Sequence, residues 1–406
     1  MKTKILHRRL STALCAVLMM TASAAPAWAE KFTVAVVPDT QRYSDVKLPQ
    51  PRGEETFRQQ MQYLVDKRDE KNLVFVSFVG DIVETGGGRW RMGPKGYVRR
   101  VDIGELEYLW QSDQTGFRDF DTRAEWDIAN RAISVLTRAG IAFGMVPGNH
   151  DYDDHPDKWD PNFQGKTRPV PVAVDGRTWD FYFGPKSPHF LDKPWYGGSF
   201  DQGMNSYQFF SGGGRRFLHL SLEFNPGPAA LTWAQGVIDA NPGLPVIMST
   251  HNWLLPAAKS EGGYSPGVAD GTNHLFPQEI WDRFVRKNPA IFLILCGHQI
   301  TGTGIKGVVQ GENLRIDRND AGYPVYQVLQ DYQDYTVGPD GQPGSANGGA
   351  GWLRFIEFDT DRRKIHFYTY STLLNRYAGR NGEQTFGVDS AQYSDFELDF
   401  PPQLLE

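Results

Sequence analysis

Short apolar runs recur along the chain, and polar side chains follow each of them directly. The runs are rich in Val, Ile and Phe and are bounded by turn-forming residues, which is the pattern of buried β-strands. The strands predicted in this way are Phe32–Val37, Leu73–Val79, Ile141–Val146, Pro245–Met248 and Ile291–Leu295. The polar side chains therefore stand at strand ends.

Helical periodicity lies between the predicted strands. Apolar residues recur at helical spacing in Glu54–Lys71 and in Thr122–Ala139, and both segments are predicted helices. Asp121 is a candidate N-cap of the second helix, and Gly140 ends it. A further helix is expected over Pro277–Val285.

The second half of the chain is richer in antiparallel patterns. Trp352–Phe358 and Lys364–Tyr370 flank a short polar segment and predict a β-hairpin. The Gly- and Pro-rich stretch Gly338–Gly351 before it is expected to be a long loop. Together these elements predict an α/β fold in which two packed mixed β-sheets, a β-sandwich, are flanked by α-helices.

The first residues have the pattern of an export signal rather than of a folded element. Basic residues precede the apolar stretch Leu10–Met20, and Ala27-Trp28-Ala29 gives a small-residue cleavage pattern. The apolar stretch is too short for a permanent membrane span. We therefore expect residues 1–29 to be a signal peptide and the protein to be periplasmic or secreted.

The mature chain is acidic, and its charge limits the classes of molecule that it is expected to bind. Residues 1–29 carry four basic and no acidic residues, so 38 basic and 48 acidic residues remain, a net charge of −10. This balance makes nucleic acid an unlikely partner. No other stretch is apolar enough for an integral membrane anchor, and Cys296 is the one mature cysteine. Because no low-complexity linker separates the motifs, we expect residues 30–406 to form one domain.

Five polar motifs follow the predicted strands in order along the chain. Strand ends at one edge of a sheet are the usual place for an active site in an α/β protein. The motifs are Pro38-Asp39-Thr40-Gln41, Gly80-Asp81-Ile82-Val83-Glu84, Gly148-Asn149-His150-Asp151, Ser249-Thr250-His251 and Cys296-Gly297-His298.

This ordered set resembles the calcineurin-like metallophosphoesterase superfamily, whose motifs are D-x-H, G-D-x-x-D, G-N-H-D/E, a lone His after a strand, and G-H-x-H. The resemblance runs from about Phe32 to about Tyr370, and the opening Pro-Asp-Thr-Gln is similar to a secreted bacterial branch. It implies a two-metal hydrolase that cleaves a phosphate ester by in-line attack of a metal-bound hydroxide.

The resemblance also implies a role for each matching residue. Asp39 would bind the first ion, Asp81 would bridge both ions, and the second ion would be completed by Asn149, His251 and His298. His150 would serve the leaving group, oriented by Glu84, which stands where the family more often has Asp. Taken singly, an Asp after a strand is more often a helix cap and a lone His a structural hydrogen-bonding group.

Two departures from the motifs concern the first ion. The D-x-H histidine is replaced by Gln41, and the second histidine of G-H-x-H by Ile300. Gln41 could still bind through its amide oxygen, which would make the site richer in oxygen and weaker. We expect one firmly held and one weakly held divalent ion (Mn, Fe, Zn, Mg or Ca). Asp331, Gln330 or Gln333 would be a replacement ligand or a hydrogen-bonding group at a sheet end.

Two long segments follow ligand motifs, near residues 85–120 and 152–206. They are expected to be insertions that overhang the metal edge and shape the substrate pocket, or else aromatic satellite clusters that hold the loops in place. His155 and His189 in the second segment could touch substrate or lie at the surface, and of these two we expect the surface. Asp151 would cap a turn or support the site from behind its ligands.

Three functions fit these observations. The first is a phosphodiesterase or phosphomonoesterase acting on a small molecule or a cell-envelope component. The second is a catalytically weak or inactive protein of the same fold that binds a phospho-ligand or a glycan, as the two lost histidines suggest. The third is a nuclease, which the acidic balance disfavours.

Overall fold

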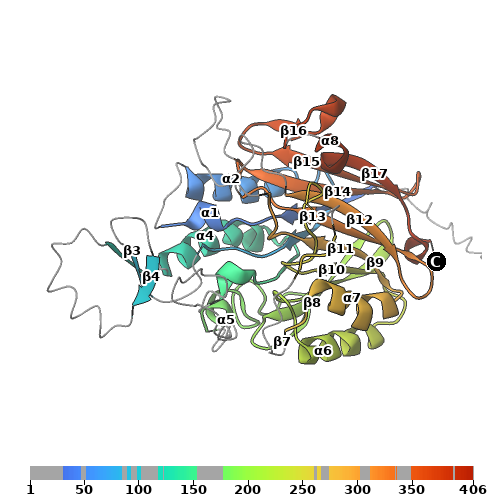
Figure 1. Ribbon diagram of the computed structural model, residues 1–406, viewed down its shortest axis with the longest axis horizontal. Helices are drawn as coiled ribbons and strands as arrows, with labels where there is room; N and C mark the ends of the chain where they lie inside the picture. Colours follow the sequence, from blue (N-terminus) through green and yellow to red (C-terminus); the bar gives the residue numbers. More distant parts are fainter. Residues whose placement is uncertain are drawn as a thin grey trace, which may run out of the picture.

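Two β-sheets, each of seven strands in the described part of the chain, lie face to face at the centre of the molecule (Figure 1). The structure is a computed structural model that describes residues 31–46, 52–84, 89–92, 98–101, 118–121, 123–152, 177–259, 263–266, 274–301, 311–333, 335, 349–386 and 389–405.

The first sheet has the strand order β16 (Arg376–Ala378), β15 (Lys364–Ser371), β14 (Trp352–Asp359), β1 (Phe32–Val37), β2 (Leu73–Phe78) and β6 (Phe143–Met145), with β17 (Asp395–Asp399) also paired to β15. The second sheet has the order β12 (Glu312–Arg318), β13 (Pro324–Gln330), β11 (Ile291–Cys296), β10 (Val246–Ser249), β9 (Arg215–Ser221), β8 (Asn205–Gly212) and β7 (Tyr196–Phe200). A small third sheet has the order β4 (Val98–Val101), β3 (Arg89–Met92) and β5 (Arg118–Asp121).

Helices cover the outer faces of the two large sheets. On the first sheet lie α1 (Gln41–Ser44), α2 (Gly53–Asp66) and α4 (Arg123–Ala139), with α5 (Arg177–Phe183) packed against α4; on the second lie α6 (Pro228–Asp239) and α7 (Pro277–Arg283); α8 (Ala391–Ser394) precedes β17 (Figure 1). The alternation of β1 explains the layers: Val34 and Val36 pack between the sheets, whereas Ala35 and Val37 pack against the helices. The predicted fold class, two packed mixed sheets flanked by helices, is confirmed.

Most predicted elements are present, with shifted ends. The predicted hairpin is the antiparallel pair β14 and β15, but α2 ends at Asp66 rather than Lys71. The chain turns there, and Asn72 takes a left-handed φ of 44° before β2 begins. Asp121 is the last residue of β5, paired with Arg89, so its prediction as the N-cap of α4 is wrong.

The second predicted insertion belongs largely to the main fold where it is described. Trp179 of α5 packs edge-on against Trp126 of α4 with ring centroids 6.3 Å apart, and β7 extends the second sheet. His189 is buried between the side chains of Thr137 and Asn130, so the prediction that it lies at the surface is wrong. His155 lies outside the described residues, as do much of 85–120, most of 338–351 and all of 1–30.

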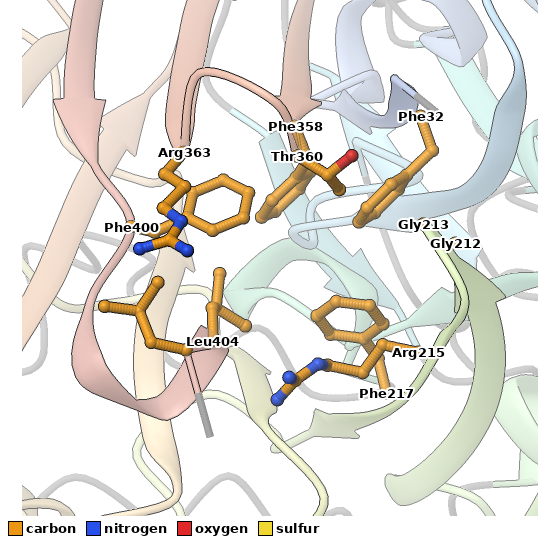
Figure 2. Close-up of a pocket in the computed structure, with 11 residues that line it drawn as sticks. Phe32, Gly212, Gly213, Arg215, Phe217, Phe358, Thr360, Arg363, Phe400 and Leu404 are labelled. Carbon is orange, nitrogen blue, oxygen red and sulfur yellow. The ribbon is translucent and has the colours of Figure 1, made fainter. Parts of the chain in front are cut away.

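In the described part of the chain, no helix is both long enough and apolar enough to span a membrane. A cavity of about 220 Å³ (Figure 2) lies where β1 begins, lined by Phe32, Phe217, Phe358 and the side chains of Arg215 and Arg363. Asp39 follows the other end of β1, so this cavity is separate from the predicted ligands.

A buried ion pair joins the two sheets. The carboxylate of Glu312 on β12 lies 2.7 Å from the guanidinium of Arg354 on β14, and the two side chains are 2% and 0% exposed. The hydroxyl groups of Tyr332 and Ser394 also donate to Glu312, at 2.9 and 2.5 Å. Removing one partner would leave the other charge buried and uncompensated.

We therefore expect Arg354→Met to lower the free energy of unfolding by about 3–5 kcal/mol, measured by urea denaturation followed by circular dichroism. The matched control is Arg362→Met, which removes an exposed pair with Glu397 at 2.7 Å and should lower the free energy of unfolding far less, because solvent screens exposed pairs. Equal losses in the two variants would contradict a special role for the buried pair.

Candidate metal centre

All six residues predicted as metal ligands meet at one edge of the two sheets. Asp39 follows β1, Asp81 follows β2, Asn149 follows β6, and His251 and His298 follow β10 and β11; Gln41 begins α1. Parallel strands bring their carboxyl ends to the same edge, and the first and second sheets present these edges side by side. The ligand atoms of Asp81, His251 and His298 lie within 4.8 Å of one another.

His251 shows which of its ring nitrogens faces the site. Its Nδ1 lies 2.7 Å from the carbonyl oxygen of Val79, which can only accept, so Nδ1 carries the hydrogen. Nε2 lies 3.2 Å from Oδ1 of Asp81 and 3.1 Å from Oδ1 of Asn149. With Nε2 deprotonated, three lone pairs would converge here, and a cation would satisfy all of them. A backbone carbonyl that fixes the ring in this way is typical of metal-binding histidines.

Around Asp39 the structure leaves buried oxygen atoms without partners. Oδ1 of Asp39 accepts the backbone N–H of His298 at 3.0 Å, but Oδ2 has no hydrogen-bond partner. The amide nitrogen of Gln41 donates to Oδ2 of Asp81 at 3.1 Å, and its Oε1 likewise has no partner. Buried oxygen atoms are seldom left unsatisfied, so these residues fit a divalent cation.

The charges of the site also fit a divalent cation. Burial raises the pKa of Asp39, and the neighbouring carboxylates of Asp331 and Asp81 raise it further. Burial acts in the same direction on Asp81, but the histidines His251 and His150 outweigh it and lower the pKa of that carboxyl. Among the described residues, no Lys or Arg lies within 4 Å of either the Asp39 or the Asp81 carboxylate.

Glycines make room for the carboxylates. A Cβ on Gly148 would stand 2.2 Å from Oδ1 of Asp81, and a Cβ on Gly297 would stand 2.1 Å from Oδ2 of Asp39. Neither distance is tolerated between non-bonded atoms. Each glycine therefore belongs to one ligand motif and accommodates the carboxylate of another.

Three predicted ligands have left-handed backbone conformations. The φ angles are 34° at Asp39, 49° at Asp81 and 74° at His298. Residues other than glycine rarely adopt this region, and those that do cluster at functional sites, where the surrounding structure holds them in place. The turn after each strand thus aims the side chain at the shared edge.

His150 and Glu84 lie together, and both the backbone carbonyl and the carboxylate of Glu84 stand near the imidazole. Nδ1 of His150 is 2.8 Å from the backbone carbonyl oxygen of Glu84 and 3.6 Å from its carboxylate. The carboxylate also lies 3.2 Å from the guanidinium of Arg42. The backbone of Glu84 therefore makes the closest contact to the ring, and its side chain supplies a nearby charge.

Asp151 serves both of the roles considered for it. Oδ2 accepts the backbone N–H of Gly148 at 2.8 Å, which caps the turn that carries Asn149. Oδ1 accepts the N–H groups of Ile82 and Val83 at 2.8 and 2.9 Å. Asp151 thereby ties the turn after β6 to the loop after β2, behind the ligands.

The end of β9 adds groups that the sequence patterns did not single out. The ring of Phe224 lies 5.3 Å from that of His298 and 6.0 Å from that of His251. Asn252 donates to Oδ1 of Asn225 at 3.0 Å. No metal-binding motif follows β9, so only its place beside β10 in the sheet could have indicated these residues.

The chain is similar to known proteins in sequence. A family model described as calcineurin-like phosphoesterase matches residues 32–302. The uncharacterized protein YvnB of Bacillus subtilis (strain 168) is 24% identical over 378 residues, which are 92% of this chain and 22% of YvnB. The chain thus spans about a fifth of the length of that curated relative.

Two solved structures are also similar. GAP50, the anchor in the inner membrane complex of Plasmodium, is 10% identical with a TM-score of 0.39, and the match covers 86% of this chain and 87% of that one. Purple acid phosphatase PPD1 from yellow lupin (Lupinus luteus) seeds is 11% identical with a TM-score of 0.43, covering 92% of this chain and 55% of that one.

The glycine contacts generate a test of the site. Gly297→Ala would push the Asp39 carboxylate out of place, so we expect Mn²⁺ affinity, measured by calorimetry on metal-stripped protein, to fall at least about tenfold. The control is Gly236→Ala in α6, where a Cβ meets nothing within 4 Å and helix propensity rises. Unchanged Mn²⁺ binding by a folded Gly297→Ala variant would contradict the assignment of Asp39.

Proposed function

The chain belongs to the calcineurin-like phosphoesterase family, and from this premise we propose that it is an exported enzyme that hydrolyses a phosphate ester by in-line attack of water on phosphorus. The proposal is carried by the convergence of buried lone pairs from Asp39, Asp81, Asn149 and His251 at one sheet edge, with His150 beside them. A small molecule or a cell-envelope component is the proposed substrate.

The proposed ligands are Asp39, Gln41, Asp81, Asn149, His251 and His298. Two divalent ions bound there would activate the attacking water and neutralise charge on the phosphoryl oxygens. Two sets of hydrogen bonds hold the donors in place. The Val79 carbonyl accepts from His251, and the Asp151 carboxylate accepts backbone N–H groups of the turns that carry Asp81 and Asn149. Little reorganisation is therefore needed on binding. Imidazole nitrogens favour a transition metal at the second position.

His150 is proposed to protonate the leaving oxygen. Its Nδ1 is fixed by the Glu84 carbonyl, which leaves Nε2, 3.9 Å from Oδ2 of Asp81, facing the site. The side chain is 22% exposed, so a substrate can reach it. Burial lowers the pKa of His150, but the charges of Asp81 and Glu84 outweigh this and raise it above its usual value.

Export is proposed from the pattern of residues 1–29, which lie outside the described residues. Processing after Ala29 would give a mature chain that begins at Glu30. Amino-terminal sequencing of the protein from the periplasmic or secreted fraction of an expressing cell tests this. An unprocessed Met1 in the cytoplasm would contradict it.

The decisive experiment assays hydrolysis of chromogenic phosphodiesters and phosphomonoesters while Mn²⁺ is titrated into metal-stripped protein. We expect metal-dependent activity, and we expect His150→Ala to lower kcat about 10²–10⁴-fold without changing Mn²⁺ affinity. His366→Ala is the control, because His366 pairs with Asp395 at 2.6 Å on β15, away from the ligands.

The alternative is a protein of this fold that binds a phospho-ligand or a glycan without cleaving it. A folded, Mn²⁺-loaded protein with no activity on either class of ester, but with saturable binding of a phosphate ester, would favour that alternative. Activity that His150→Ala leaves intact would instead overturn the role of His150.

A further inference from the structure

The first ion of the family's site has lost two imidazole ligands in this chain, at Gln41 and Ile300. Asp39 and Asp81 remain, yet Oδ2 of Asp39 and Oε1 of Gln41 are buried without partners. These unpartnered atoms point to a cation, and the structure brings a further carboxylate to the same place.

That carboxylate belongs to Asp331, directly after β13. Strands β11 and β13 are parallel neighbours, with Cys296 opposite Leu329. Asp331 lies two residues beyond this pair, at the same edge of the sheet where His298 follows β11. Strand neighbours lie about 5 Å apart, so a carboxylate at residue 331 is delivered next to the ligand motif of β11.

The side chain of Asp331 is buried, with 0% exposure, and it is connected to the ligands. Its Oδ2 accepts the amide of Gln333 at 3.0 Å. The amide oxygen of Gln333 in turn contacts the amide of Gln41, which donates to Oδ2 of Asp81 at 3.1 Å. A continuous polar path thus runs from Asp331 to Asp81.

Asp331 adds a third buried carboxylate to this end of the sheets, together with Asp39 and Asp81. Burying like charges at one sheet edge is costly unless opposite charge accompanies them, and a cation would supply that charge. Oε1 of Gln41 has no hydrogen-bond partner and is available to such a cation while the amide nitrogen of Gln41 donates to Asp81.

We propose that Asp331 is a ligand of an oxygen-only divalent cation site formed with Asp39, Asp81 and Gln41, in place of the two imidazoles that this chain lacks. The inference rests on the proposed function in assuming that a metal binds at this edge. Such a donor set suits hard cations, Mn²⁺, Mg²⁺ or Ca²⁺, whereas His251 and His298 provide the second position with nitrogen donors.

Neighbouring polar residues have other contacts. Gln330 donates to the carbonyl of Cys296 at 2.7 Å and holds the sheet end together. Oδ1 of Asp331 accepts the backbone N–H of Gln333 at 3.0 Å and so forms a turn. The side-chain oxygen of an asparagine would accept the same hydrogen bond and preserve this turn. Asp331→Asn therefore removes the charge while it keeps the turn.

The test compares metal-stripped wild type with Asp331→Asn. By calorimetry with Mn²⁺, we expect two binding events in the wild type, and in the variant one of them weakened about 10–100-fold while the other is retained. Mn²⁺ should also raise the Tm of the variant by less than that of the wild type. A merely structural aspartate would leave the Mn²⁺-induced rise in Tm unchanged.

Two further variants sharpen the comparison. Asp331→His restores an imidazole, so we expect it to bind two ions with its preference moved from Mn²⁺ toward Zn²⁺. Asp359→Asn is the matched control, because Oδ1 of Asp359 also accepts a backbone N–H, that of Arg362 at 2.9 Å, in the hairpin turn remote from the ligands. It should leave both Mn²⁺ events unchanged.

The outcomes separate this inference from the proposed function. Wild-type Mn²⁺ affinities and an unchanged Mn²⁺-induced rise in Tm in Asp331→Asn would overturn the inference, even if the enzyme hydrolyses phosphate esters. Loss of one Mn²⁺ event in a protein with no esterase activity would uphold the ligand and overturn the function.

Discussion

Repulsion between buried carboxylates at the junction of the two sheets is the constraint on which the rest of this structure depends. Asp39 and Asp81 follow adjacent parallel strands, and both are almost fully buried. No described Lys or Arg lies within 4 Å of either carboxylate. Such an arrangement lowers the free energy of unfolding. A divalent cation that binds the folded state would raise it again through linkage.

The surrounding structure holds these charges together against their repulsion. Left-handed turns at Asp39 and Asp81, glycines that admit the carboxylates and the clamp of Asp151 all act locally. Deeper in the molecule, a polar cluster ties the sheets: the hydroxyl groups of Ser77 on β2 and Ser249 on β10 are 2.7 Å apart. The imidazole of His219 lies 2.9 Å from the same Ser249 oxygen. The ligand edge is thus built on two sheets that are bonded to each other as well as packed.

Sequence patterns predicted the parts of the fold that follow from periodicity. The apolar runs located β1, β2, β10 and β11, and the residue after each run reached the edge because parallel strands end together. Contacts that need three-dimensional packing could not be predicted. Burial of His189 depends on α4, some 50 residues away, and no local pattern indicates that the backbone of Glu84 lies nearer to the imidazole of His150 than its carboxylate does.

The difference between the two proposed ion positions follows from which strand ends supply each of them. One position receives nitrogen from the second sheet, through His251 and His298, and the Val79 carbonyl has already fixed the tautomer of His251. The other proposed position would receive oxygen atoms from Asp39, Asp81 and Gln41, with Asp331 as the further proposed ligand. Asp81 stands between them, 3.2 Å from Nε2 of His251 and 3.1 Å from the amide of Gln41. Because Asp81 would serve both proposed positions, a cation at either one would relieve the repulsion felt at the other, and their occupancies would be coupled.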